Sequence, residues 1–365
     1  MSRNIQSRLS APLILWVLCC GLSFNVRAQS GEAPLTSREL VRRLYQLPAH
    51  PEKRDEIVEE IRKRGIGFPL TDGLRSLVAT KSGNDALLRR TLEEAERRRL
   101  NPAASALPSE AEGREILSRT RAATLAAAEA MPDFVVKQLI TRSYALGSSG
   151  NWKARDRLAI AVSYRAGAGE EYKVLAVNGM PPNVDFKEGR GYEQLGGTTS
   201  TGEYVSMLAQ LFAEERQASF KMVDTDLLRG RRTVVYEYEV KRPFSLLRIK
   251  DGALEVRAGY HGRVWIDREN YRVLRFEEIA DLPAEVPAGF HIIAARGLID
   301  YDWVEINERQ YLLPSRAEII LTSGRNDQSV QSRNEIRFRD YQKFGTDVKI
   351  IEDVEFEDDQ DGKKP

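Results

Sequence analysis

Hydrophobic residues recur along this chain with two different periods, and the change of period divides it into two parts. From residue 36 to residue 100, apolar residues return every three or four positions among many charged ones. This spacing is typical of short amphipathic helices, because positions three and four apart share one helix face. Breaks rich in proline and glycine separate the helices. We therefore expect a small helical domain over residues 36–100.

Near the end of this stretch, two glutamates each precede an arginine by four residues: Glu93 before Arg97, and Glu94 before Arg98. Oppositely charged side chains at this spacing are neighbours on the surface of a helix and support it in solvent. The two pairs therefore predict a helix face that is exposed to water.

The segment 101–108 is rich in proline, alanine and serine and shows no periodicity, which predicts a linker. Ser109 and Glu112 then have the spacing of a capping box ahead of an alanine-rich run. A helix should begin there and end before Pro132. This helix introduces a second domain, which we expect over residues 109–350.

From Asp133 onward the hydrophobic period is two, and it persists through most of the remaining chain. Alternation of this kind predicts strands with one packed face and one wet face, which antiparallel sheets allow. Turn signals rich in glycine, asparagine and aspartate separate the runs, among them Asn178-Gly179. The sequence therefore predicts an α+β protein with one large meandering antiparallel sheet. The clearest alternating runs are Leu158–Tyr164, Val234–Val240, Ile299–Trp303 and Ala317–Leu321.

One helix interrupts the strand pattern. Ser200 and Glu203 have capping-box spacing, and an apolar stripe follows them. A single amphipathic helix cannot bury such a stripe alone, so the helix should lie against the sheet. Two interpretations stay open: core packing without a cavity, or a lid over an apolar groove that binds a ligand. The candidate ligand-binding residues are Tyr204, Leu208, Leu211 and Phe212.

The first residues have the order of a secretory signal peptide. Arg3 and Arg8 precede an apolar run over residues 11–24, and small residues lead to Ala28. The apolar run is shorter than the roughly 20 residues that a membrane-spanning helix needs. We therefore expect a signal peptide over residues 1–28, cleaved after Ala28, and a protein located in the periplasm or secreted.

Both cysteines of the chain, Cys19 and Cys20, lie within this predicted signal peptide. The mature chain would then have no thiol, which excludes disulfides, thiolate metal ligands and cysteine nucleophiles. An alternative is a lipid anchor on Cys20, although Cys19 then stands where lipoproteins have a small residue.

The net charge of the mature chain argues against one class of partner, nucleic acids. Cleavage would remove three arginines and no acidic residue, which leaves 52 basic and 54 acidic side chains. A near-neutral chain lacks the clustered positive charge on which nucleic-acid binding depends, so we expect no nucleic-acid partner. Residues 351–365 are strongly acidic and are predicted to form a disordered tail.

A short pattern in the second half points to a known family. In residues 262–267 (GRVWID) a strand ends in an aromatic, an apolar residue and aspartate, and residues 272–276 (RVLRF) return. Together with a sheet crossed by a helix, this pattern resembles the outer-membrane lipoprotein carriers and their relatives, which include periplasmic regulators of envelope stress. The resemblance covers about Glu110 to Ile350. It implies a half-barrel whose concave apolar surface holds an acyl chain or another hydrophobic group, with the helix as a lid.

Catalytic and metal-binding chemistry finds little support in the sequence. The three histidines, His50, His261 and His291, are far apart and form no pair at a ligand spacing. Ser200 lies in a loop that misses the spacing of a nucleophile elbow, and helix capping explains it. We therefore predict no catalytic residue, no metal and no cofactor, and an enzyme is the least favoured class.

These observations favour an exported periplasmic protein that binds a hydrophobic ligand or a lipidated partner without catalysing a reaction. The alternative is an envelope protein-interaction or sensory module, in which the charged helices of residues 36–100 dock a partner and the sheet serves as a scaffold. Pull-downs with the two parts expressed separately would distinguish them, because a partner held by the helices alone favours the second function.

Overall fold

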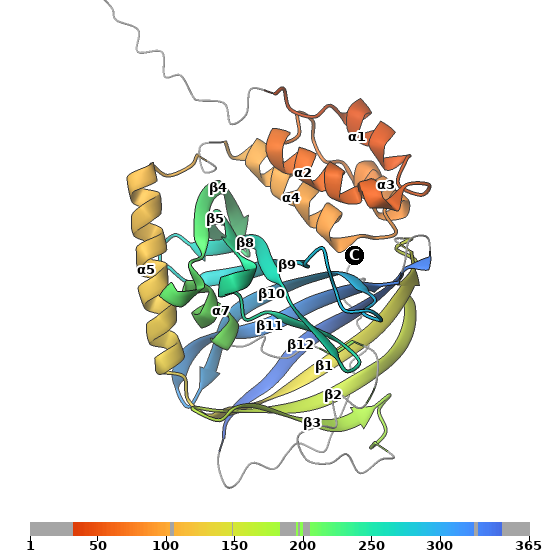
Figure 1. Cartoon of the computed structure of the whole chain (residues 1–365). Coiled ribbons are helices and arrows are strands. Elements are labelled where there is room, and N and C mark those ends of the chain that lie inside the picture. Colours follow the sequence, from red (N-terminus) through yellow and green to blue (C-terminus); the bar gives the residue numbers. More distant parts are fainter. Residues whose placement is uncertain are drawn as a thin grey trace, which may run out of the picture.

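The structure, a computed structural model, describes residues 32–102, 106–147, 149–182, 195, 198–199, 205–324 and 328–344. The expected signal peptide, the acidic tail, Ser200 and Tyr204 lie outside these residues, so the expectations for them stay predictions. Within the described residues, four N-terminal helices lie beside a large curved sheet that carries its own helices (Figure 1).

The sheet is antiparallel throughout and is not closed into a barrel. Its ten strands follow the order β3-β2-β1-β12-β11-β10-β9-β8-β5-β4, so β3 and β4 form the two edges. Neighbouring strands of the sheet are also consecutive in the sequence except at two places, where β1 lies against β12 and β5 against β8. This arrangement confirms the predicted α+β class. The strands are β1 (Phe134–Leu146), β2 (Lys153–Arg165), β3 (Gly169–Val177), β4 (Ser219–Leu228), β5 (Arg231–Val240), β8 (Gly259–Asp267), β9 (Val273–Asp281), β10 (Ile292–Ile306), β11 (Arg309–Ser323) and β12 (Val330–Lys343).

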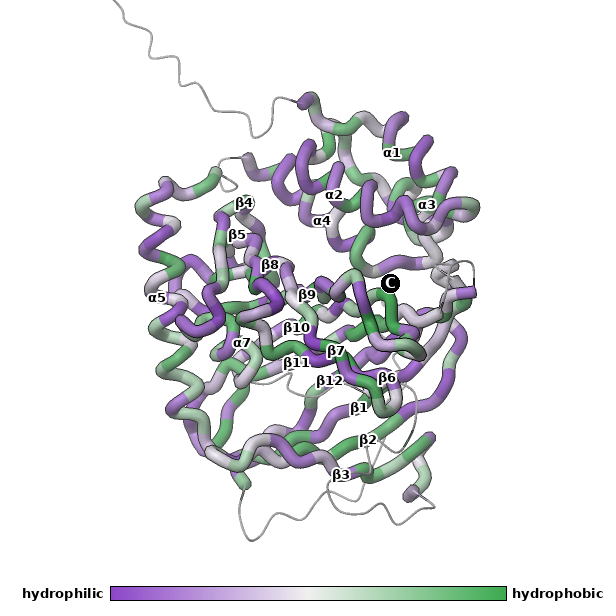
Figure 2. Tube along the Cα trace, in the orientation of Figure 1, coloured by the Kyte–Doolittle hydropathy of each residue, from purple (hydrophilic) through white to green (hydrophobic). Residues whose placement is uncertain are grey.

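Local sequence explains both the strands and the turns between them. The alternation of hydrophobic and hydrophilic residues along the strands is visible in Figure 2. The predicted turn at Asn178-Gly179 forms, with φ values of 51° and 80° that these two residue types tolerate best. Arg229-Gly230 makes an equivalent turn between β4 and β5, with φ values of 48° and 77°. Here glycine supplies only one of the two left-handed positions, and arginine occupies the other.

The hairpin between β8 and β9 is closed by the side chain of Asp267, which is 1% exposed. Its Oδ1 accepts hydrogen bonds from the backbone N–H groups of Glu269 (2.8 Å) and Asn270 (3.2 Å). Its other oxygen pairs with Arg231. The aspartate that ends the GRVWID strand therefore has a structural role in its own hairpin.

Two helices and a small hairpin lie inside the curve of the sheet (Figure 1). Helix α5 (Glu110–Glu129) begins as predicted, because the Ser109 hydroxyl accepts a hydrogen bond from the Glu112 N–H (3.2 Å). It contacts α7 (Val205–Phe212), and both contribute to the main apolar core. The hairpin of β6 (Arg248–Asp251) and β7 (Leu254–Arg257) covers a second, smaller core.

The N-terminal helices enclose an apolar core of their own. Thr36, Thr71 and Asp85 cap three of them, each by accepting a backbone N–H of the first turn. A small helical region at the N-terminus is therefore confirmed, while its independence as a domain stays a prediction. The helices are α1 (Ser37–Leu44), α2 (Arg54–Arg64), α3 (Asp72–Lys81) and α4 (Ala86–Leu100), and the short 3₁₀ helices of the chain are η1 (Pro51–Lys53), η2 (Glu214–Arg216) and η3 (Arg242–Phe244).

The expectation that the charged pairs of α4 face solvent is wrong for Glu94 and its neighbours on that side, whereas Glu93 stays half-exposed and pairs with Arg75 of α3 (2.8 Å). Glu94 is 7% exposed, because this side of the helix lies against the sheet. Arg97 pairs with Asp226 of β4 (3.0 Å), and Arg98 pairs with Asp224 (2.5 Å). The carboxylates of the neighbouring strand have thus replaced the partners four residues away in the same helix.

Candidate functional site

Helix α7 buries its apolar stripe against the concave face of the sheet. Leu208, Leu211 and Phe212 are 7%, 0% and 0% exposed. The ring of Phe212 stacks on Phe220 of the edge strand β4, with centroids 5.4 Å apart. Burial of this kind agrees with both interpretations of the stripe, core packing and lid.

A row of aromatic rings continues from α7 across β4, β5 and β9. Phe220 contacts Tyr238 at 6.3 Å, and Tyr238 stacks on Phe276 at 5.5 Å. Tyr260 meets the edge of Tyr238 at 5.9 Å. Each aromatic pair of this geometry contributes about 0.5–1.5 kcal/mol beyond the burial of its area. The row makes the concave face aromatic from the sheet edge to its middle.

The main apolar core, to which α7 belongs, includes side chains that stay partly accessible to solvent. Met207, Phe220 and Ile319 pack against the buried core residues, yet each keeps part of its side chain accessible to solvent. Apolar surface on a concave face that stays partly accessible is the usual surrounding of a ligand site.

One carboxyl interrupts this apolar face. Side chains alternate along β9, so Glu278 points to the same face as Phe276, whose contact with Tyr238 identifies that face as the concave one. Phe276 belongs to the core under α7, while Ala280 packs against the core under the β6–β7 hairpin. Glu278 therefore lies between the two apolar cores.

Glu278 has no hydrogen-bond or ion-pair partner among the described residues. Its cross-strand neighbour on β10 is Gly297, which offers no side chain. Burial raises the pKa of the Glu278 carboxyl to about 7, although the side chain keeps some solvent access. Burial is the main cause that raises the pKa of both Tyr238 and Tyr260, and the negative charge of Glu278 is the second. The carboxyl is thus close to the aromatic row.

The same cross-strand row is polar further along the sheet. From Gly297 it passes through Ile319 and Asn334 to Arg142. Asn334 is 1% exposed and donates a hydrogen bond to the backbone carbonyl of Thr198 (2.9 Å), so Thr198 lies against this part of the sheet. The Arg142 guanidinium forms two bonds of 2.6 Å with the carboxylate of Asp156.

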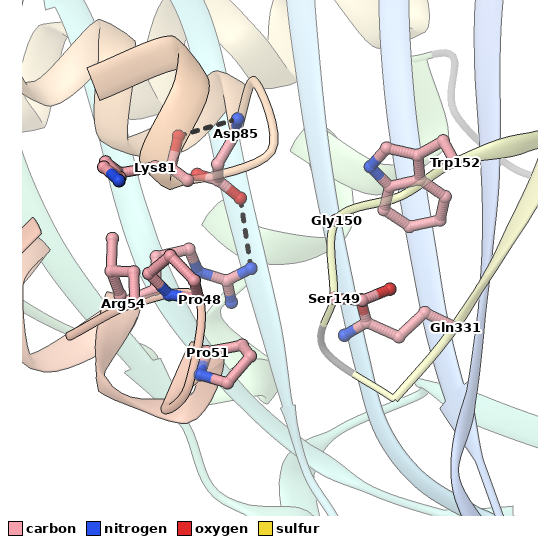
Figure 3. Close-up of a pocket in the computed structure, with 11 residues that line it drawn as sticks. Pro48, Pro51, Arg54, Lys81, Asp85, Ser149, Gly150, Trp152 and Gln331 are labelled. Carbon is pink, nitrogen blue, oxygen red and sulfur yellow. Dashed lines mark hydrogen bonds and ion pairs between the residues drawn. The ribbon is translucent and has the colours of Figure 1, made fainter. Parts of the chain in front are cut away.

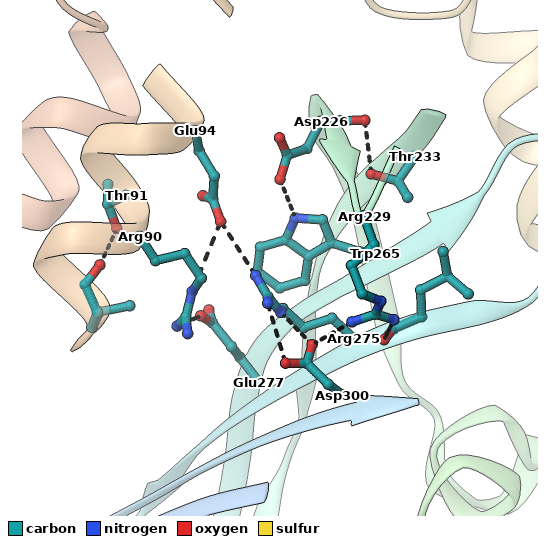
Figure 4. A network of polar contacts seen from close by, with 12 residues as sticks. Arg90, Thr91, Glu94, Asp226, Arg229, Thr233, Trp265, Arg275, Glu277 and Asp300 are labelled. Carbon is teal, nitrogen blue, oxygen red and sulfur yellow. Dashed lines mark hydrogen bonds and ion pairs between the residues drawn. The ribbon is translucent and has the colours of Figure 1, made fainter. Parts of the chain in front are cut away.

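The opposite face of β9 carries a different kind of site, an ionic interface with α2 and α4 (Figure 4). Glu277 accepts hydrogen bonds from Arg90 (2.9 Å) and Arg62 (3.1 Å). Arg275 pairs with Asp300 at 2.7 Å and with Glu94 at 3.5 Å. The N-terminal helices are therefore attached to the sheet through buried charges.

A second point of the same interface centres on β4. The carboxylate of Asp226 accepts hydrogen bonds from Arg97 (3.0 Å) and from the indole nitrogen of Trp265 (3.2 Å), and Figure 4 shows the indole bond. Arg275 lies over the ring of Trp265, 5.6 Å from its centre. Arg97 and Asp226 thus join α4 to the edge strand of the sheet.

Two carboxyls in this interface have opposite pKa shifts. Burial alone would raise the pKa of Glu277, but the charges of Arg62 and Arg90 outweigh it and hold this pKa below its usual value. Glu94 makes only longer contacts of 3.5 and 3.8 Å with arginines. Burial and the nearby charge of Asp226 therefore raise the pKa of Glu94 to about 7. At neutral pH Glu94 is partly protonated, and Glu277 is ionised.

We expect the stability of the protein to fall as the pH rises from 5 to 7. Glu94 and Glu278 have a pKa of about 7 in the folded chain but about 4.5 in the unfolded one. The folded state therefore binds more protons in this window, and the free energy of unfolding decreases with pH up to about 7. Urea unfolding at several pH values measures this slope. Glu94→Gln and Glu278→Gln should each flatten it, and an unchanged slope in both would contradict the prediction.

A small pocket of about 40 Å³ lies where the N-terminal helices meet the β1–β2 hairpin (Figure 3). Its lining includes Arg54, which donates a hydrogen bond to the carboxylate of Asp85 (3.1 Å). The backbones of Gly83 and Gly150 approach so closely nearby that a Cβ at Gly83 would lie 3.0 Å from the Gly150 Cα. Space for one or two water molecules beside a charge that is already paired supports a contact between the two regions rather than a ligand site.

The histidines stay far from one another in the fold. His50 and His291 are exposed and His261 is half-buried, and each lies 2.8–3.1 Å from a different carboxylate. In the described part of the chain, no three histidine, cysteine, aspartate or glutamate side chains are grouped to hold a metal ion. None of the helices described is both long and apolar enough to span a membrane.

Comparisons with known proteins find only distant similarity. No protein family and no curated protein matches the sequence. A solved DUF1329 family protein from Desulfovibrio piger is 10% identical, with a TM-score of 0.27, over 64% of this chain and 92% of its own. MucB in the MucA/MucB complex of Pseudomonas aeruginosa is 11% identical, with a TM-score of 0.16, over 60% and 93%. These similarities are remote, so the proposals below rest on the geometry of this chain.

Glu278 and the tyrosines beside it were not among the predicted site residues. A signal for Glu278 exists in the sequence, because it stands in phase with the apolar Leu274 and Phe276 and so occupies an inward position of β9. Of the predicted residues, the structure brings Leu208, Leu211 and Phe212 together, while Tyr204 lies outside the described residues.

Proposed function

We propose that this chain is an exported, non-catalytic binding protein of the cell envelope that holds the apolar part of a ligand, or of a lipidated protein, on the concave face of its sheet. The observation that carries the proposal is the partly accessible apolar surface of the main core, which includes Met207 of α7, Phe220 of β4 and Ile319 of β11. The helix covers the neighbouring apolar surface and serves as the lid.

Native mass spectrometry of the protein purified after export tests the proposal directly. The expected spectrum contains the mature chain together with adducts of lipid mass, which lipid extraction removes. A single apo mass, obtained under conditions that preserve the adducts of a known lipid carrier, would count against ligand binding. The mass of the mature chain also reports whether cleavage occurs after Ala28.

Substitution of Leu208 by glutamate should distinguish the two interpretations of α7, a lid over a ligand site and ordinary core packing. Leu208 keeps 7% exposure at the rim of α7, whereas Phe212, one turn further, is fully buried against Phe220. We expect Leu208→Glu to cost about 2 kcal/mol or less of unfolding free energy and to abolish the lipid adducts, because a charge now borders the ligand.

Phe212→Glu is the matched control on the same helix. Burying a charge in place of the stacked ring should destabilise the chain by more than about 4 kcal/mol. Circular dichroism during urea unfolding measures both variants. If Leu208→Glu unfolds as readily as Phe212→Glu, the stripe is ordinary core and α7 is not a lid.

A second candidate function is protein interaction through the N-terminal helices. It is favoured by their separate core and by their attachment to the sheet through ion pairs, which water and a charged partner can replace. Because Arg62 and Arg90 are already paired with Glu277, such a partner would use the outer helices α1 and α3 or would first displace the sheet. A pull-down with residues 32–102 alone, against the whole chain, tests this function.

A further inference from the structure

We propose that the ligand of the concave face is an amphiphile with a cationic, amine-type head group, and that the carboxylate of Glu278 is its counterion. This inference rests on the proposed function, since it names the head group of the ligand held there. It follows from the position of Glu278, from its neighbours and from the charges on both faces of β9.

The position of Glu278 suits a head group better than a tail. Along β9, the residue two before it belongs to the apolar core under α7, and the residue two after it packs on the core under the β6–β7 hairpin. A ligand that places its apolar chain along either core would bring its polar end to the carboxyl between them. An amphiphile therefore satisfies both parts of the surface.

Within the part of the chain that the structure describes, the neighbours of Glu278 leave its carboxyl without a partner. Gly297 stands opposite it on β10, and Gly262 takes the same place on β8, in the register fixed by the flanking pairs. In place of the missing side chains, the Tyr238 hydroxyl lies over Gly262, and Ile319 lies over Gly297. The Tyr238 hydroxyl donates its hydrogen bond to the backbone carbonyl of Glu277 (2.7 Å), so it does not donate one to the Glu278 carboxyl.

Two described cations near this row have partners other than Glu278. Arg142, in the same cross-strand row, is bound by Asp156, and Arg216 donates from one terminal nitrogen to the carbonyl of Phe244 (2.9 Å), while its Nε has no hydrogen-bond partner among the described residues. Buried carboxylates in proteins are normally paired, as Glu277 is with Arg62 and Arg90 on the other face. Glu278, on the concave face, has no such partner among the described residues, and a ligand ammonium would supply the missing charge.

A proton competes with the cationic head group for the carboxylate of Glu278. Because burial raises its pKa to about 7, Glu278 is neutral in acid and charged in mild alkali. A cationic head group binds the charged form only, so its affinity should rise with pH, whereas a neutral head group of the same chain length should not show this dependence.

Three ten-carbon amphiphiles that differ only in the head group test the inference: decylammonium, 1-decanol and decanoate. Isothermal titration calorimetry on the whole mature chain, below the micelle concentration, measures their affinities at pH 5 and pH 8. We expect decylammonium to bind about tenfold more tightly than 1-decanol at pH 8, and decanoate to bind most weakly. At pH 5 the preference for decylammonium should disappear.

Glu278→Gln should remove the preference for decylammonium at pH 8 and keep the affinity for 1-decanol. Glu239→Gln is the control, because Glu239 is an exposed glutamate on β5 that changes the overall charge equally. It should retain the full preference. A preference that survives in Glu278→Gln, or is lost in Glu239→Gln, overturns the role of Glu278.

The outcomes also separate this inference from the proposed function. Equal binding of all three amphiphiles, or tighter binding of decanoate, overturns the head group while the apolar site stands. Binding of none of them at either pH overturns the apolar site itself, and the head group with it.

Discussion

Replacement of Gly262 by alanine is expected to destabilise the protein by at least about 3 kcal/mol. A Cβ at this position would lie 2.0 Å from the backbone oxygen and 2.7 Å from the carbonyl carbon of Glu277 on the paired strand. Neither atom is the end of a flexible side chain, so β8 and β9 would have to move apart. The hydrogen bond from the Tyr238 hydroxyl to the same carbonyl would be lost in the process.

Gly297 is the matched control for this prediction. It stands on the other side of Glu278, but a Cβ there would meet only the Cδ1 atom of Ile319 at 3.2 Å, a terminal methyl that can rotate away. Gly297→Ala should therefore cost less than about 1 kcal/mol. Urea unfolding followed by circular dichroism compares the two variants. Equal losses would mean that β8 and β9 do not approach each other as closely as the structure shows.

The hydrophobic period predicts most of this fold because it reports a local property, the alternation of side chains between two faces of a strand. It predicts the strands at Leu158–Tyr164 and Val234–Val240 and the turn at Asn178-Gly179, and all three are present. It does not predict that β1 lies against β12, since this pairing joins residues almost two hundred positions apart and depends on how the whole sheet curls.

The arrangement of charges was harder to predict than that of apolar residues. Spacing alone assigned Arg97 and Arg98 to glutamates of their own helix, whereas Asp226 and Asp224 of β4 bind them instead. An apolar stripe indicates only that a face is buried, but an ion pair requires the identity of the opposing surface. The sequence contains that surface some 130 residues later, without any sign that the two belong together.

Adjacent residues of β9 show how one strand serves two surfaces. Glu277 faces the N-terminal helices and is held by arginines, while Glu278 faces the concave side and has no cation among the described residues. Alternation places them on opposite faces, so the two identical side chains differ only in what lies across from them. Comparison of their variants therefore measures the two environments within one strand.

Glu277→Gln should destabilise the protein by about 3–5 kcal/mol at neutral pH, because it leaves Arg62 and Arg90 buried without their counterion. The pKa of Glu277 lies below 4.5 in the folded chain, so its ionised form stabilises the fold above that pH. The difference between variant and parent should therefore shrink as the pH falls below 4.5. Urea unfolding at pH 7 and pH 3.5 measures both effects.

Glu278→Gln is the control, with an effect of the opposite sign. At pH 8 the Glu278 carboxyl is ionised, which destabilises the folded state. The uncharged amide should therefore raise the free energy of unfolding at this pH by about 1–2 kcal/mol. This value is reduced because the side chain keeps partial access to solvent. Hydrogen exchange adds a spatial readout, because only Glu277→Gln should loosen α2 and α4. If the two variants destabilised the chain equally, the ion pairs of Glu277 would not attach the N-terminal helices to the sheet.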